Sequence, residues 1–180
     1  ADGKRYFDWD TCKELVFDKY PGKVKAIEIK LSQGAKPGKG GVLPKEKNNK
    51  EIAEIRGVEP YTDILSPSYH TAFSNVREMV DFIELLAEKS GVPVGIKSAV
   101  GDLAQWYELV EIMKKENKGP DFITIDGGEG GTGAAPVEFV DNMGMPMRDG
   151  LRLVHSSLVG VGLRDQIRIG VAGKIVSAFD

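Results

Sequence analysis

Residues 121–133, DFITIDGGEGGTG, combine a short apolar alternation with a run of glycines. The alternation before Asp126 is typical of a buried strand, and five of the seven residues from Gly127 to Gly133 are glycine. Glycine-rich turns let backbone N–H groups approach an anion or a planar ring. The stretch therefore predicts a strand whose carboxyl end carries a ligand-binding loop.

Three more segments share the β-branched composition and the glycine or proline boundaries of buried parallel strands. Together with the first, they predict strands at 25–32, 93–100, 121–127 and 167–173. Helical patterns separate them. Ser74 is expected to cap a helix that ends at Gly91. The expected inner faces of the next two helices carry Leu103, Tyr107, Val110 and Met113, and Leu151, Val154, Leu158 and Val159.

Strands that alternate with helices indicate an α/β fold with a parallel sheet. Two architectures fit this pattern: an open doubly wound sheet and part of a closed (β/α)8 barrel, whose complete form needs about 250 residues. Both bind ligands at the carboxyl ends of the strands. A long excursion over residues 34–73, with a short helix near 51–56, follows the first predicted strand, and it is expected to fold over that strand's carboxyl end.

Composition excludes several classes of function. The 180 residues, 41% of them hydrophobic, suit one domain, and 24 basic against 27 acidic residues give a net charge of -3, which indicates neither a nucleic-acid nor a membrane partner. Cys12 is the only cysteine, so we expect a reducing, cytoplasmic setting. No apolar run has the length of a membrane span. The chain starts with Ala1 and ends in apolar sequence, and we expect a piece of a longer protein.

Two nucleotide-binding motifs match only in part. Gly128, Gly130 and Gly133 satisfy G-x-G-x-x-G, but Pro136 interrupts the helix that this fingerprint requires. The stretch GAKPGKGG is one residue short of a P-loop, and Gly40 occupies its Ser/Thr position. Neither motif supports a nucleotide site of these kinds.

Charged residues at strand ends are candidates for ligand contacts. Lys97 lies in an otherwise apolar strand, where a cation is expected either to meet an anionic or electron-rich group or to reach solvent from the strand's end. Asp126 is expected to bond a hydroxyl or a backbone N–H of a glycine turn, or to act only as a turn residue. Lys36 and Lys39 fit a ligand role and a solvated turn equally well.

The remaining polar residues suggest no catalytic set. His70 and His155 have no partner at metal-ligand spacing, neither is expected at a strand end, and His155 is expected to pack against its helix neighbours. The runs KEKNNKE (45–51) and KKENK (114–118) are typical of solvated surface. If the protein is an enzyme, a cofactor is expected to carry the chemistry.

The order of these motifs resembles a known family. The matching blocks are IEIKLSQGAKPGKGGVLP, EIAEIRGV, ILSPSYHTAFS, VGIKSAVG, DFITIDGGEGGTGAAP and LRDQIRIGVAGKIVSAFD. Across nearly the whole chain they resemble the FMN-binding synthase domain of glutamate synthase and its stand-alone archaeal and bacterial relatives. The resemblance implies that residues 1–180 form an incomplete (β/α)8 TIM barrel of the FMN-linked oxidoreductase type, which lacks the first and last strands. It also implies reduction of 2-iminoglutarate, formed from 2-oxoglutarate and ammonia, to L-glutamate.

The resemblance assigns roles to individual residues. Lys36 and Arg56 match positions that hold the two carboxylates of 2-oxoglutarate, and Lys97 matches the lysine that faces the flavin. Gln33 and the Gly40–Gly41 turn match residues around the substrate and the flavin ring. The implied cofactor loop comprises Asp126, Gly127, Gly128, Glu129, Gly130, Gly131, Thr132 and Gly133, and Gly173 with Lys174 would begin the phosphate cradle.

This chain also departs from the large glutamate synthases. Val42 stands where they have Gln, which removes one polar substrate contact, and Glu129 stands where they have Asp. The cysteines of their iron–sulfur cluster and their amidotransferase domain are absent, so a cluster, a glutaminase and an electron donor would come from further sequence or from partners. Two alternatives stay open: another FMN-barrel oxidoreductase or isomerase, and a non-catalytic fragment that binds FMN or phosphate.

Overall fold

The computed structural model describes residues 6–131, 135–177 and 179. Its centre is a parallel sheet of four strands, which are β1 (Ile27–Lys30), β4 (Val94–Ser98), β5 (Phe122–Asp126) and β6 (Arg168–Ala172), side by side in that order. All four predicted strands are confirmed, and each observed strand ends within two residues of its predicted limits. The α/β class predicted from the alternating pattern is therefore correct.

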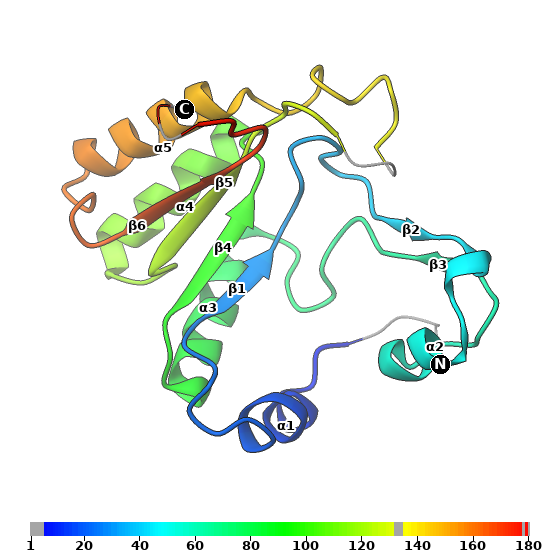
Figure 1. Ribbon diagram of the computed structural model, residues 1–180. Coiled ribbons are helices and arrows are strands. Elements are labelled where there is room, and N and C mark those ends of the chain that lie inside the picture. Colours follow the sequence, from blue (N-terminus) through cyan, green and yellow to red (C-terminus); the bar gives the residue numbers. More distant parts are fainter. Residues whose placement is uncertain (1–5, 132–134, 178, 180) are drawn as a thin grey trace.

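Three long helices cover one face of this sheet (Figure 1). They are α3 (Val76–Ser90), α4 (Leu103–Glu116) and α5 (Met147–Gly160), each of which connects or follows neighbouring strands. A doubly wound sheet reverses its strand order and carries helices on both faces. The sequential order and the one-sided cover seen here are instead compatible with part of a (β/α)8 barrel. Over the described residues the four strands form an open sheet.

The alternation of side chains along each strand produces two unlike faces. One face carries isoleucines and valines, of which Ile96, Ile123 and Ile125 are at most 2% exposed. They pack against apolar residues of the helices, such as Val80 and Leu158, and form a single core. Because the other face is not covered by these helices, its side chains are available to meet other groups.

The ends of α3 follow local capping chemistry. Asn75, not the predicted Ser74, is the N-cap, because its side chain accepts a hydrogen bond from the Glu78 backbone N–H at 2.9 Å. Ser74 instead donates from its hydroxyl and its backbone N–H to the Glu78 carboxylate. These hydrogen bonds from Ser74 hold the pKa of the Glu78 carboxyl below its usual value. Gly91 ends the helix in a left-handed conformation, as predicted.

The predicted inner faces of the other two helices are partly wrong. Leu103 and Tyr107 of α4 are exposed, whereas Trp106 and Leu109 are buried against the core. On α5 the prediction is correct for Val154 and Leu158 but wrong for Val159, which is exposed. His155 is also exposed and accepts a hydrogen bond from Arg164 Nε, so the expectation that it packs is wrong. A small rotation of each helix, set by packing, moves such boundary residues to the outside.

The excursion after β1 forms an arm of its own, visible to the right of the sheet in Figure 1. It contains β2 (Val42–Leu43), the short 3-10 helix η2 (Lys45–Lys47), α2 (Lys50–Arg56) and β3 (Ile64–Leu65), and β2 pairs antiparallel with β3. The short helix predicted near 51–56 is confirmed.

Asn48 fixes the turn of this arm. The residue is fully buried, and its side-chain amide donates to the carbonyls of Glu59 at 2.8 Å and Thr62 at 3.0 Å. The expectation that the run KEKNNKE is entirely solvated is thus wrong at Asn48, because this amide replaces water for two backbone carbonyls. The run KKENK at 114–118 is exposed throughout, as expected.

The described N-terminal residues form α1 (Trp9–Cys12), which continues into the π-helical segment η1 (Lys13–Asp18). Phe7 packs edge to face against Phe82 of α3, with ring centroids 5.3 Å apart, and Trp9 contacts the core. Within the described ranges, no helix has both the length and the apolar composition of a membrane span.

The core predicts a large difference between neighbouring residues of α5. Leu158→Ala should lower the free energy of unfolding by about 2–5 kcal/mol, because Leu158 is completely buried and a cavity would remain. Val159→Ala, at an exposed position, should change it by less than about 0.5 kcal/mol. Urea unfolding of both variants measures the difference, and equal losses would contradict the packing described here.

Candidate functional site

The loops at the carboxyl edge of the sheet meet through their backbones. Gly34 follows β1 and Gly127 follows β5, and a Cβ atom on Gly34 would overlap the carbonyl oxygen of Gly127. Gly127 is itself buried, and its backbone N–H donates to the carbonyl of Ala172, at the end of β6, at 2.8 Å. The loops of three strands therefore come together only because side chains are absent.

The segment before α5 joins this junction. Gly128 is buried, its N–H donates to the Met145 carbonyl at 2.9 Å, and a Cβ on it would overlap the carbonyl of Gly144. A Cβ on Gly144 would in turn overlap the carbonyl of Gly34. We call Gly34, Gly127, Gly128 and Gly144 the glycine junction. Its packing explains the first two glycines of the loop without any ligand.

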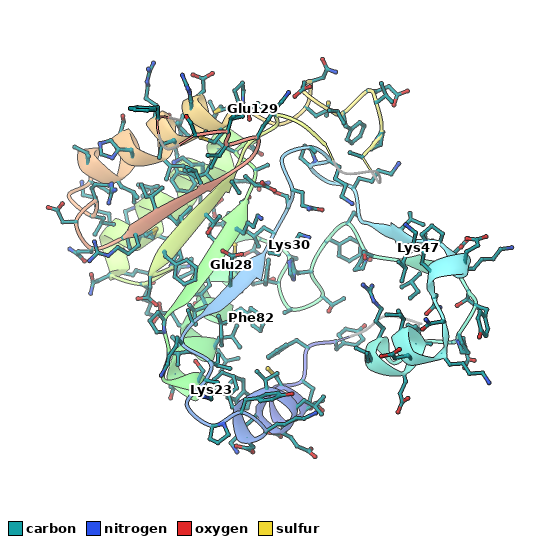
Figure 2. All side chains as sticks on the ribbon, in the orientation of Figure 1. Lys23, Glu28, Lys30, Lys47, Phe82 and Glu129 are labelled. Carbon is teal, nitrogen blue, oxygen red and sulfur yellow. The ribbon has the colours of Figure 1, made fainter. Side chains whose placement is uncertain are left out.

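Glu129 has a partner within the chain. Its carboxylate turns back over Gly127 and accepts the backbone N–H of Met147 at 2.8 and 2.9 Å, where α5 begins. A negative charge at a helix N-terminus is favourable because the first N–H groups lack partners there. Figure 2 labels Glu129 at this end of the molecule. The residue predicted to bind the cofactor thus also orders the loop against α5.

The middle of the loop remains accessible. Gly130 has a positive φ of 77° and donates its N–H to the Asp141 carboxylate at 2.8 Å. Gly131 is exposed. Gly131 is therefore the part of the described loop where backbone is open to a ligand, since the Gly130 N–H already has a partner. Two further predicted cofactor residues, Thr132 and Gly133, lie outside the residues that the structure describes.

Lys36 is the most unusual charge in the structure. It lies in the loop after β1 and is only 5% exposed, although it carries an ammonium group. Its backbone is held in a turn, in which the Lys36 N–H donates to the Gln33 carbonyl at 3.1 Å. Within the described ranges no carboxylate pairs with its side chain. Because burial of an unpaired cation is costly, this position favours an anionic ligand.

The Gly40–Gly41 turn lies next to this lysine. A Cβ on Gly41 would lie 3.4 Å from Lys36 Nζ, so the turn leaves room above the ammonium. Gly40 packs directly on the backbone carbonyl of Ser66, which no larger residue would allow. Gln33 is half-buried in the same loop. The structure thus brings together four of the residues predicted to surround the substrate.

The uncovered face of the sheet carries a row of polar side chains. Lys97 of β4 lies opposite Lys30 of β1 and Thr124 of β5 in the strand register, so the three share one face. Thr124 donates from its hydroxyl to the Glu28 carboxylate at 2.7 Å, across β4. Figure 2 labels Glu28 and Lys30 on β1. Lys97 is half-buried and has no anionic partner among the described residues.

Asp126 ties two loops together. Its carboxylate accepts the backbone N–H of Gly34 at 3.2 Å, so it bonds a glycine turn as expected, although the turn is the one after β1. This hydrogen bond holds the Lys36 loop against the end of β5.

The remaining predicted site residues lie in two different places. Gly173 packs against Gly127, with a φ of 118°, and Lys174 beside it is exposed at the same edge of the sheet. Arg56 is exposed at the end of α2, which lies beyond the β2–β3 ribbon, away from the sheet edge (Figure 1). Of the predicted substrate residues, Arg56 is thus the one that the structure places apart from Lys36.

A cavity lies on the helix side of the sheet. It has a volume of about 940 Å³ and is bounded by segment 68–75, by α3 and α4, and by the ends of β1 and β4. None of the predicted site residues that the structure describes lines it. Its lining is mainly apolar and it offers no buried cation, so we place the candidate site at the glycine junction, Lys36 and Lys97 instead.

Sequence reasoning missed some residues of this edge. His70 donates from its ring Nε2 to the Lys30 carbonyl at 2.9 Å and stacks on Phe73, with ring centroids 4.7 Å apart, so it fastens the returning arm to the end of β1. As expected, it lies on no strand of the parallel sheet, but its contact with the end of β1 was not foreseen. Ser66 and Gly144 also lie here, and only their contacts with residues distant in sequence identify them.

Comparisons with known proteins agree with the family named by the resemblance. A family profile described as the conserved region in glutamate synthase matches residues 16–180. The chain is 46% identical over 155 residues to the glutamate synthase large subunit-like protein YerD of Bacillus subtilis (strain 168), covering 86% of this chain and 29% of that protein. It is 36% identical over 167 residues to the archaeal glutamate synthase (NADPH) of Methanocaldococcus jannaschii, covering 92% and 32%. It is 33% identical over 159 residues to the chloroplastic ferredoxin-dependent glutamate synthase of Spinacia oleracea, covering 86% and 9%. The chain thus spans about a third or less of the length of these relatives.

A methyl group added to a glycine of the junction should destabilise the folded protein. Gly34→Ala should lower the free energy of unfolding by at least about 1–3 kcal/mol, because the new Cβ would overlap the Gly127 carbonyl. Gly101→Ala is the matched control, since open space surrounds its Cβ position and the expected change is small or stabilising. Thermal unfolding of the two variants checks this, and a stable Gly34→Ala protein would contradict the junction.

Proposed function

This chain belongs to the glutamate synthase family, and we propose that it forms the FMN- and substrate-binding part of an oxidoreductase that makes L-glutamate. In this proposal the four-stranded sheet is part of a (β/α)8 barrel that further strands complete, with the uncovered sheet face inside the barrel. The substrate is 2-iminoglutarate, formed from 2-oxoglutarate and ammonia. We infer a reducing, cytoplasmic setting from the single, half-buried Cys12.

The observation that carries the proposal is Lys36, a residue only 5% exposed whose ammonium has no carboxylate partner among the described residues. A dicarboxylate supplies the missing anion, and the cost of burying the lysine is then offset by a charge-assisted hydrogen bond. A ligand with a carboxylate explains this lysine better than an uncharged ligand does. Arg56 would hold the other carboxylate through its planar fork if the arm closes toward the sheet. Gln33 and the Gly40–Gly41 turn complete the substrate contacts in this proposal.

The residues at the edge fit FMN. Lys97 offers a cation on the uncovered face, where the pyrimidine edge of a reduced flavin gains negative charge. Gly131 offers exposed backbone next to the Gly130 turn, and Gly173 with Lys174 offers a turn and a positive charge to a phosphate. Asp126, Gly127, Gly128 and Glu129 hold this edge in shape, and Thr132 and Gly133 would extend the loop.

When bound, FMN would supply the hydride that reduces the imine. The protein's own residues bind and orient the reactants. Lys36 would fix one carboxylate of the substrate at the loop after β1. Lys97 would hold the flavin's pyrimidine edge and offer it a positive charge. The Asp126–Gly34 hydrogen bond keeps the substrate loop and the cofactor loop at a constant separation.

The electron donor of this reaction is proposed by analogy with the names of the relatives. The names specify NADPH in one relative and ferredoxin in another, so one of these is the proposed electron donor. Ammonia would arrive free or from a glutaminase, and an iron–sulfur cluster, where one is needed, would come from further sequence or a partner.

The cofactor claim is tested by titration with FMN, monitored by flavin absorbance and fluorescence. Lys97→Met should weaken FMN binding by about tenfold, because it removes a charged hydrogen-bond donor, or shift the flavin's reduction potential to a lower value. Lys118→Met, in the exposed run 114–118, is the matched control and should bind FMN normally. A wild-type protein that takes up no FMN would refute the proposal, and an unchanged Lys97→Met variant would refute the role of Lys97.

The substrate claim predicts opposite effects on stability and on binding. Lys36→Met should leave the free energy of unfolding unchanged or raise it, because the variant replaces a buried unpaired charge with an apolar chain of similar length. The same variant should abolish the 2-oxoglutarate-dependent reoxidation of reduced flavin, and Arg56→Lys should slow it. Stopped-flow absorbance measures the reoxidation, and rates equal to wild type would count against both residues.

A further inference from the structure

The arm brings a serine next to the buried lysine. The β2–β3 ladder pairs Val42 with Leu65, and the next pair continues it, because the Ser66 N–H donates to the Gly41 carbonyl at 2.8 Å. Gly40 has no side chain, so the Ser66 backbone carbonyl can lie directly on it. Ser66 is therefore fixed against the Gly40–Gly41 turn from the opposite strand, although it lies 30 residues from Lys36 in the chain.

Lys36 and Ser66 reach the same small region. One point, the Cβ position that Gly41 leaves empty, lies 3.4 Å from Lys36 Nζ and 3.7 Å from Ser66 Oγ. Lys36 is 5% exposed, while Ser66 is exposed, so the ammonium lies on the inner side of this region and the hydroxyl on its outer side. No hydrogen bond from the Ser66 hydroxyl is present among the described residues. The two donors thus both lie beside Gly41, where the absence of a side chain lets a ligand approach them together.

We propose that Ser66 is a substrate-binding residue, which donates a hydrogen bond to the same carboxylate of 2-oxoglutarate that Lys36 holds. This inference rests on the proposed function and adds a donor to its site. A carboxylate has two oxygens and accepts several hydrogen bonds, so one ammonium does not satisfy it. The hydroxyl supplies a second donor at an angle that a flexible lysine alone does not fix. Ser66 also links substrate binding to the arm, since its position depends on the pairing of β2 with β3.

The pairing also explains why glycine is needed at two successive positions. Gly40 admits the Ser66 backbone, and Gly41 leaves open the region between the two donors. A side chain at residue 41 would stand between the ammonium and the hydroxyl and would leave less room for a carboxylate to reach both.

The test compares 2-oxoglutarate affinities by isothermal titration calorimetry of the FMN-loaded protein. Ser66→Ala should weaken binding by about tenfold, as expected for a lost hydrogen bond to a charged group. Ser66→Thr keeps the hydroxyl and should stay within about threefold of wild type. Ser68→Ala, an exposed serine two residues away, is the matched control and should bind normally. Thermal unfolding of each variant checks that the arm is intact.

The outcomes separate this inference from the proposed function. A wild-type protein that binds neither FMN nor 2-oxoglutarate overturns both. A protein that binds both ligands, with equal affinity for 2-oxoglutarate in wild type and Ser66→Ala, overturns only the role of Ser66. A Ser66→Ala variant that loses affinity together with Ser68→Ala also overturns it, because the loss then reflects the segment and not the hydroxyl.

Discussion

At the carboxyl edge of the sheet, main chain packs directly on main chain. Gly34, Gly127, Gly128 and Gly144 leave no room for side chains between the loops after β1 and β5 and the segment before α5. Backbone groups brought this close need hydrogen-bond partners, and they have them in Ala172, Met145 and the Asp126 carboxylate. The contact fixes where each loop leaves its strand. It therefore also fixes where Lys36, the accessible glycines and the start of α5 lie.

The sheet itself separates structure from chemistry. One face is apolar, and burying it under α3, α4 and α5 provides the main stabilisation of the chain. The other face carries Lys30, Lys97, Thr124 and Glu28, which would be unfavourable in a second apolar core. Such a face suits a barrel interior that holds a charged cofactor at its carboxyl end. The polar row is thus the feature that links this fold to the proposed function.

The arm carries two residues that are proposed to bind substrate carboxylates, Ser66 and Arg56. Asn48 holds its turn, β2 and β3 form its ribbon, and His70 fastens its returning strand to the end of β1. These contacts place Ser66 beside Lys36, while Arg56 lies farther out on α2. A movement of the arm would change the distance of Arg56 from the sheet edge more than that of Ser66, which is paired to the Gly40–Gly41 turn.

Local patterns in the sequence were enough for the strands, for most helix limits and for the family, because β-branched runs, capping residues and glycine blocks act over a few neighbouring residues. They were also enough to single out Lys97 and Asp126 as charges at strand ends, whereas the role of Lys36 came from the family resemblance. Which face of α4 and α5 is buried was decided by helix packing, which periodicity gives only approximately. The burial of Lys36 and Asn48, the helix-capping contact of Glu129 and the approach of Ser66 to Gly41 were decided by the tertiary structure alone. Each depends on groups far apart in the chain, whose meeting is fixed by strand order and by backbone contact at the glycines.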